Sequence, residues 1–290
     1  MDFRNGRELL ELCDKSNQKI SEIMKEREIS QTESTLDEIN YKMSKALEIM
    51  KESAKTPLTT LIKSMGGLIG GESAKLHKMQ MTGKNICGTV LSKAITYSMS
   101  ILEVNSSMGV IVATPTAGSS GVVPGVLLAL QEEYNLSDEK VLEGLFTAGA
   151  IGYLFMRNGS VAGAEIGCQG EVGVAAAMGA GAIVEIMGGT PEMVLNAATI
   201  ATMNLLGLVC DPVGGLVESP CQSRNAIGAS NALICAEMSL AGIKQMIFFD
   251  EIVDTLMSIG RSLPAELRET GLGGCAATPT GYAKAMEIFG

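Results

Sequence analysis

Hydrophobic positions follow two different patterns on either side of Pro57. Before it, apolar residues recur every three or four positions between charged residues. This pattern is typical of amphipathic helices and predicts helices over about residues 5–29 and 33–54. After it, long apolar segments alternate with glycine-rich turns. We therefore expect a mainly α fold, a compact bundle of apolar helices joined by glycine-rich loops, with a charged helical hairpin at the N-terminus.

Charge sets the N-terminal segment apart. Its first 55 residues include 22 charged ones, whereas the remaining 235 residues include 32. The prediction is an N-terminal helical segment over residues 1–56 and a main domain over residues 57–290. Two interpretations of the first segment stay open: a hairpin packed on the main domain, or a contact surface for a partner chain.

Local signals place the starts of two later helices. Residues 190–192 read Thr-Pro-Glu. This is a capping hydroxyl, a proline suited to the first turn and an acid near the positive helix end. They predict a helix that runs to about residue 208. Asp250 is expected to cap another helix that ends near Gly260.

The longest apolar stretches are Val172–Met187, which contains Glu185, and Ala197–Cys210, which contains Asn204. A membrane-spanning helix needs about 20 predominantly apolar residues. Both stretches fall short of that length, so we expect buried core helices and no membrane span.

Composition supports helices over sheets. Hydrophobic residues make up 46% of the chain, but aromatic residues only 4%, and there are 34 Gly and 18 Met. Strands would favour aromatic and β-branched residues. The net charge of −10 excludes the basic surface of a nucleic-acid binder. The charged N-terminus does not read as a secretory signal, and seven cysteines, an odd number, argue against a disulfide framework. We therefore expect a cytoplasmic protein with reduced thiols.

Three segments, residues 114–121, 158–171 and 204–225, concentrate small, polar and sulfur-containing residues. They carry Cys168, Cys210 and Cys221, each at an expected helix end or turn. The cysteine spacings of 42 and 11 residues match neither paired zinc ligands nor a ferredoxin pattern. Three thiolates around a four-iron cluster would leave one iron open as a Lewis acid.

These segments carry a specific resemblance. The runs PTAGSSGVVPGVL, GAEIGCQGEVGVA, NLLGLVCDPVGG and PCQSRNAIG resemble blocks of the iron–sulfur-dependent L-serine dehydratase alpha chain, and RETGLGGCAATPTG resembles its C-terminal block. The likeness covers about residues 60–280 in the family's order. It implies an L-serine ammonia-lyase, a carbon–nitrogen lyase of amino-acid degradation and gluconeogenesis. The enzyme would eliminate water from L-serine to give pyruvate and ammonia.

The resemblance also implies a cofactor and a site. Cys168, Cys210 and Cys221 fall on the ligands of a four-iron four-sulfur (4Fe-4S) cluster, and no pyridoxal phosphate (PLP) is expected. The resemblance and the local chemistry together give the remaining candidates. The expected catalytic residues are Ser119, Ser120, Arg224 and Glu165, and the expected substrate-binding residues are Thr116, Gly118, Ser119, Asn158 and Asn225.

Each candidate also has a purely structural interpretation. The loop over residues 115–121 could be a tight turn, and Arg224 could form a salt bridge with Glu218. Glu165 and Glu171 lie three residues on either side of Cys168. Either could hold the substrate ammonium or orient a ligand, or merely cap a helix.

The base that removes the α-proton is not identified in this chain. His77 is the only histidine and lies in a polar stretch, where a surface position is expected. The resemblance implies that a separate beta chain supplies the base, which would make the enzyme a hetero-oligomer. Cys275 stands where the family usually has an apolar residue, and we interpret it as a core substitution.

Three alternatives remain. The first is an aconitase-like hydro-lyase acting on another hydroxy acid. The second is a non-catalytic iron–sulfur scaffold or sensor. The third is a membrane bundle of small residues, which the short apolar stretches disfavour.

Overall fold

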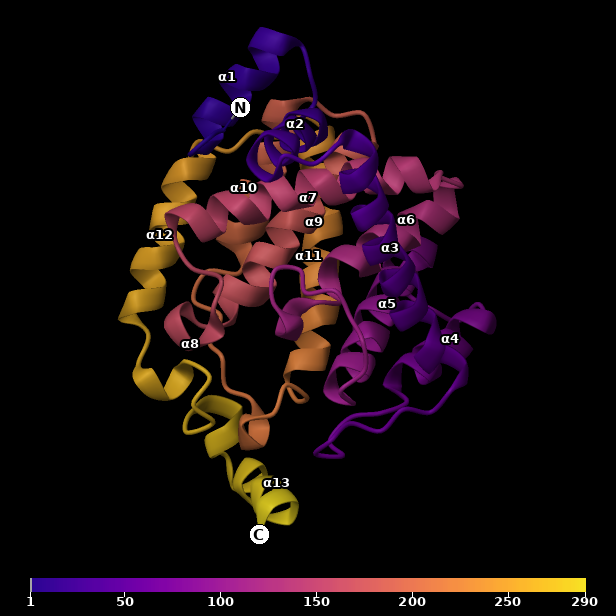
Figure 1. The fold of residues 1–290 in the computed structure, drawn as a ribbon. Coiled ribbons are helices and arrows are strands. Elements are labelled where there is room, and N and C mark those ends of the chain that lie inside the picture. The colour runs from indigo at the N-terminus through magenta and orange to yellow at the C-terminus, as the bar shows by residue number, and fades with distance from the viewer. Residues whose placement is uncertain (1) are drawn as a thin grey trace.

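The computed structural model describes residues 2–290, and it is built from helices (Figure 1). No strand occurs among these residues, apart from a single-residue bridge between Cys210 and Arg268. The prediction of a mainly α fold is therefore confirmed. The α-helices are α1 Gly6–Ser16, α2 Ile20–Thr32, α3 Leu36–Thr59, α4 Glu72–Met81, α5 Gly88–Ser106, α6 Val122–Tyr134, α7 Asp138–Asn158, α8 Gly163–Ile166, α9 Val174–Ile186, α10 Pro191–Asn204, α11 Cys221–Leu240, α12 Phe249–Ser262 and α13 Pro279–Phe289. Shorter helical turns are η1 Ala117–Ser119, η2 Gln169–Gly173, η3 Val213–Gly215, η4 Ala265–Leu267 and η5 Gly274–Ala277.

Helix α9 forms the centre of the core. All of its residues are buried, and it packs against α6, α7, α10 and α11 (Figure 1). Alanine and glycine fill much of α9, so neighbouring helices approach it closely. A Cβ on Gly181, for example, would come 2.2 Å from the side chain of Ile151. None of the helices described here is long and apolar enough to cross a membrane.

The charged N-terminal segment contains three helices rather than two. The single helix predicted over residues 5–29 is wrong, because Asn17 adopts a left-handed conformation (φ 55°, ψ 42°) that ends α1 before α2 begins. Helix α2 packs on α7, and α3 packs on α5. Helix α3 continues through Pro57 to Thr59. The division into residues 1–56 and 57–290 stays a prediction.

The helix beginning at residue 191 follows its local signal. Thr190 is the N-cap, its hydroxyl accepts a hydrogen bond from the amide of Met193, and Pro191 occupies the first turn. The helix ends at Asn204, however, and not near residue 208. Residues 205–212, which include Cys210, therefore lie outside the helix.

The expectation that Asp250 caps its own helix is wrong. Helix α12 has Phe248 at its N-cap. The carboxylate of Asp250 instead accepts hydrogen bonds from the amides of Gly6 (2.6 Å) and Arg7 (3.2 Å), at the start of α1. A carboxylate stabilises the exposed amides of a helix N-terminus, so Asp250 ties α1 to α12.

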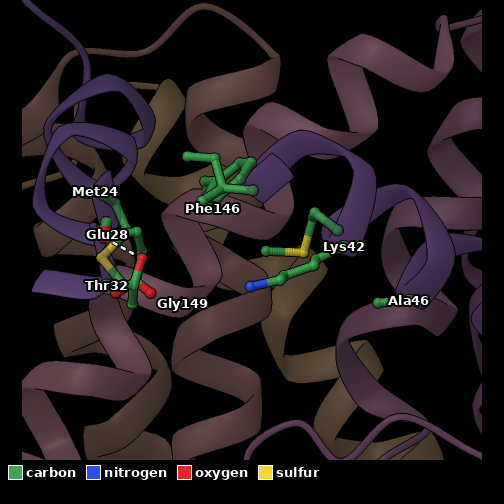
Figure 2. A pocket seen from close by; sticks show the side chains of 9 residues that line it. Met24, Glu28, Thr32, Lys42, Ala46, Phe146 and Gly149 are labelled. Atoms are coloured by element: carbon green, nitrogen blue, oxygen red, sulfur yellow. Dashed lines mark hydrogen bonds between the residues drawn. The ribbon is translucent and has the colours of Figure 1, made fainter. Parts of the chain in front are cut away.

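A cavity of about 310 Å³ lies where the N-terminal helices meet α7. Figure 2 shows Met24 and Glu28 of α2 on one side, Lys42 of α3 on the other and Phe146 of α7 between them. None of the three predicted cysteine ligands lines this cavity. We interpret it as an imperfect junction between the N-terminal helices and the main body.

Candidate functional site

The first predicted ligand, Cys168, is held at a sharp turn between α8 and α9. Gly167 has φ +77°, a left-handed value that favours glycine, and a Cβ there would come 2.7 Å from the carbonyl oxygen of Leu208. The amide of Gln169 donates to that same carbonyl at 3.0 Å. The turn therefore lies directly against the segment that leads to Cys210.

The second predicted ligand, Cys210, lies in an extended segment and not at the end of a helix as expected. Its amide donates to the carbonyl of Leu267 at 2.8 Å, and its own carbonyl accepts from the amide of Glu269 at 2.7 Å. The Cys210 thiol is only 2% exposed. A segment near the C-terminus therefore fixes the backbone of this cysteine.

Glu171 lies between these two thiols. Its Oε2 atom is 3.7 Å from the Sγ of Cys168 and 3.7 Å from the Sγ of Cys210. The three donor atoms all lie within 4.8 Å of one another. Gly163 leaves room for the carboxylate, because a Cβ there would come 2.6 Å from its Oε2. Burial raises the pKa of Glu171, and the hydroxyl of Thr116, which donates to Oε1 at 2.8 Å, only partly opposes that rise.

Arg224 provides positive charge beside the predicted cysteine ligands. Its guanidinium lies 3.7 Å from the Sγ of Cys168 and forms an ion pair of 2.7 Å with Asp211. The structural interpretation of Arg224 as a salt-bridge residue is therefore confirmed, but its partner is Asp211 and not Glu218. Burial opposes ionisation of Asp211, but hydrogen bonds from Cys275 and the charge of Arg224 keep its pKa below the usual value.

The third predicted ligand, Cys221, is the first residue of α11 and is 6% exposed. Burial raises the pKa of its thiol, and the negative charges of Cys168 and Glu171 raise it further. The pKa of the Cys210 thiol is also raised, first by its hydrogen bond with Cys168 and then by burial. All three predicted cysteines are buried, and the donor atoms of Cys168, Cys210 and Glu171 form a close group that does not include Cys221.

The glycine-rich loop over residues 115–121 lies on the same region. Asn225 anchors it, because its side-chain amide donates to the carbonyl of Gly118 at 2.7 Å and its Oδ1 accepts from the amide of Gly121 at 3.0 Å. The Ser119 hydroxyl bonds within the loop, whereas the buried Oγ of Ser120 has no hydrogen-bond partner among the described residues. A Cβ on Gly118 would come 3.0 Å from Glu171, so the loop borders the thiol group.

Residues 15–276 match the family described as "Serine dehydratase alpha chain". The chain belongs to the serine dehydratase alpha chain family. It is 47% identical over 288 residues to the "Probable L-serine dehydratase, alpha chain" of Bacillus subtilis, covering 99% of this chain and 96% of that protein. It is 43% identical to the "L-serine dehydratase, alpha chain" of Peptoniphilus asaccharolyticus, covering 96% of each.

Longer relatives contain an equivalent region. The chain is 36% identical over 283 residues to the "L-serine dehydratase" of Helicobacter pylori, a match that covers 96% of this chain but only 62% of that protein. The family assignment confirms the resemblance carried by the sequence blocks around the three cysteines.

The remaining residues considered from the sequence are more exposed than the three cysteines. Asn158 is exposed at the end of α7 and donates to the carbonyls of Arg4 and Leu154. Glu165 is exposed, and the roles predicted for both residues stay predictions. His77 is partly exposed in α4. The interpretation of Cys275 as a core residue is wrong, because Cys275 is exposed and its amide donates to Asp211 at 2.7 Å.

The donor set of this family member fits a metal or iron–sulfur cofactor. Cys168, Cys210 and Cys221 are all free and almost fully buried. Thiolates suit zinc, copper(I) and iron–sulfur clusters, and Arg224 supplies the positive charge that an assembly of thiolates requires. Sequence reasoning weighed Glu171 but did not select it. Its spacing of three residues from Cys168 puts the two side chains on one helical face. That spacing is the sequence feature that could have identified Glu171 as a site residue.

Proposed function

We propose that this chain is the alpha chain of an L-serine dehydratase, an L-serine ammonia-lyase that converts L-serine to pyruvate and ammonia. A 4Fe-4S cluster would be held by Cys168, Cys210 and Cys221. The observation that supports this proposal is the buried group of free thiols in a chain of the serine dehydratase alpha chain family. When bound, the cluster would supply a Lewis-acidic iron that polarises the serine hydroxyl.

The residues of this chain would bind and orient the substrate. Backbone amides of the 115–121 loop and the hydroxyl of Thr116 would suit the serine carboxylate. Glu171, which accepts a hydrogen bond from that hydroxyl, would suit the ammonium group. Asn225 fixes the loop through Gly118 and Gly121. Arg224 would stabilise the thiolate of Cys168 and would stay paired with Asp211. Pyridoxal phosphate is not part of this proposal.

A beta chain would complete the site. Removal of the α-proton needs a base within hydrogen-bond reach. The only histidine, His77, is in α4 and forms no described contact with the three cysteines. Relatives carry the name "alpha chain", which fits a two-chain enzyme. We propose a cytoplasmic hetero-oligomer that acts in amino-acid degradation and gluconeogenesis.

The deciding experiment is anaerobic reconstitution with iron and sulfide, with and without the beta chain, followed by pyruvate and ammonia assays on L-serine. We expect activity only with the beta chain present. Activity on malate or citrate but not on serine would favour the aconitase-like alternative. A cluster without ammonia release, even with the beta chain, would favour a scaffold or sensor.

The ligand assignment has its own test. Single replacement of Cys168, Cys210 or Cys221 by alanine should abolish cluster absorbance. Cys235→Ala is the matched control, because Cys235 is equally buried but bonds Asn204 and Asn231 away from the site. Retention of the full cluster signal in any of the three variants would contradict the assignment of that cysteine.

A further inference from the structure

We propose that the chain without its cluster binds one zinc-like divalent ion in tetrahedral coordination, with Cys168, Glu171 and Cys210 as ligands. This is a different metal state from the cluster, because it uses a carboxylate in place of Cys221. The proposal does not depend on serine dehydration, and the two can fail independently.

The distances between the donor atoms fit a small ion. Zinc lies about 2.3 Å from cysteine sulfur and about 2.0–2.2 Å from carboxylate oxygen, so tetrahedral angles place the sulfur and oxygen atoms about 3.6 Å apart. In this chain both thiol sulfurs lie 3.7 Å from the same Oε2 of Glu171. Both sulfur–oxygen separations therefore match those around one small ion, and all three donor atoms lie within 4.8 Å of one another.

The burial and charge of Glu171 also favour a bound cation. Glu171 is 9% exposed, and Cys168 and Cys210 are each 2% exposed. A carboxylate is costly to bury without a positive partner, yet no ion pair of Glu171 with lysine or arginine is found in the described part of the chain. Its hydrogen bonds come from a hydroxyl and two thiols. A divalent cation would supply the missing charge.

The surroundings complete a coordination site. The guanidinium of Arg224 lies 3.7 Å from the Cys168 sulfur, and the hydroxyl of Thr116 holds the second oxygen of Glu171 at 2.8 Å. Such outer contacts orient ligands and tune affinity. A fourth position is left for water. On binding, the thiols of Cys168 and Cys210 lose their protons to the buffer.

The consequence is competition. A chain loaded with a single ion has Cys168 and Cys210 committed to it, so cluster assembly must first displace that ion. We expect stoichiometric zinc to slow reconstitution of the cluster, and a chelator to restore it.

Cobalt(II) is the probe for the test, because tetrahedral thiolate coordination gives it intense visible bands and a thiolate charge-transfer band. The full chain is stripped of iron under anaerobic conditions and titrated with cobalt(II), then with zinc. We expect one cobalt per chain, bands of a site with two thiolates, and displacement by zinc. Absence of these bands in the wild-type chain would overturn the proposal.

Two variants separate this site from the cluster site. Glu171→Gln should weaken cobalt binding at least about tenfold, a loss at the low end of that seen even for outer-shell changes. Cys221→Ala should keep the two-thiolate cobalt spectrum while losing the cluster. The reverse pattern, with cobalt binding unaffected by Glu171→Gln and abolished by Cys221→Ala, would refute the assignment of Glu171.

Glu165→Gln is the matched carboxylate control, since Glu165 lies the same three residues from Cys168 but is exposed. It should leave the cobalt titration unchanged. Circular dichroism on every variant establishes that it is folded. Glu171→Asp provides a second test, because a shorter carboxylate should bind cobalt more weakly than Glu and more strongly than Gln. Serine activity with no cobalt site refutes only this inference, whereas a cobalt site in an enzyme inactive on serine refutes only the proposed function.

Discussion

Glu218 offers a quantitative test of how the region around Cys221 is held. Its carboxylate is 2% exposed and accepts hydrogen bonds from the hydroxyl of Ser64 (2.7 Å) and the amides of Gly66 (2.6 Å) and Leu68 (2.9 Å). These three donors belong to one loop, which folds around the carboxylate. Glu218 precedes Cys221 by three residues. Its hydrogen bonds therefore hold the loop next to the segment that contains the third cysteine.

The change Glu218→Gln replaces one acceptor oxygen by a donor NH₂ group. Whichever way the amide turns, it faces the amide of Gly66 or of Leu68, and one loop N–H loses its acceptor at about 1–3 kcal/mol. The remaining bonds lose charge assistance worth about 1 kcal/mol each. Burying a neutral amide instead of a carboxylate recovers part of this cost. We expect a net destabilisation of about 3 kcal/mol.

Thermal and urea unfolding of the full chain provide the measurement. At roughly 2–4 °C per kcal/mol for a domain of about this size, the melting temperature should fall by about 6–12 °C. The exposed Glu237→Gln in α11 is the matched control and should change stability by less than about 0.5 kcal/mol. A Glu218→Gln chain as stable as this control would show that the three hydrogen bonds do not support the loop.

Three further predictions concern packing and pH. Gly163→Ala should lower metal affinity about tenfold in a cobalt titration, because the new Cβ would lie 2.6 Å from Glu171. Gly121→Ala should cost about 1–3 kcal/mol in urea unfolding, because its Cβ would lie 2.1 Å from the Ser98 carbonyl oxygen. Burial raises the pKa of Glu185 above 4.5, so the folded state loses stability as pH rises through that raised value. Glu185→Gln should remove this pH dependence, and an unchanged stability–pH curve would contradict it.

Local signals in the sequence predicted what depends on neighbouring residues. Thr190 and Pro191 mark a helix start because capping and proline geometry act within one turn. Cys221 lies at the start of its helix for a similar reason, after Pro220. The family blocks added the three cysteines, which no spacing rule alone had identified.

Contacts between distant segments escaped prediction. Asp250 follows the local pattern of a helix cap, yet its carboxylate bonds the amide of Gly6, 244 positions away. Cys210 reads as the end of an apolar helix, but pairing with Leu267 and Glu269 draws it into an extended path. Glu171 shows a helical spacing to Cys168, whereas its approach to Cys210 depends on how two loops meet. A single sequence carries no signal for such encounters.

The pairing of Cys210 with the 267–269 segment connects the proposed metal site to the last helix, α13. That segment leads through η5 to α13, which lies at the opposite end of the molecule from α1 (Figure 1). A molecule that binds α13 and pulls this segment would move the backbone of Cys210 with it. By thermodynamic reciprocity, an ion that fixes Cys210 also restrains the terminal helix. Limited proteolysis of that helix would therefore report on whether the thiol site is filled.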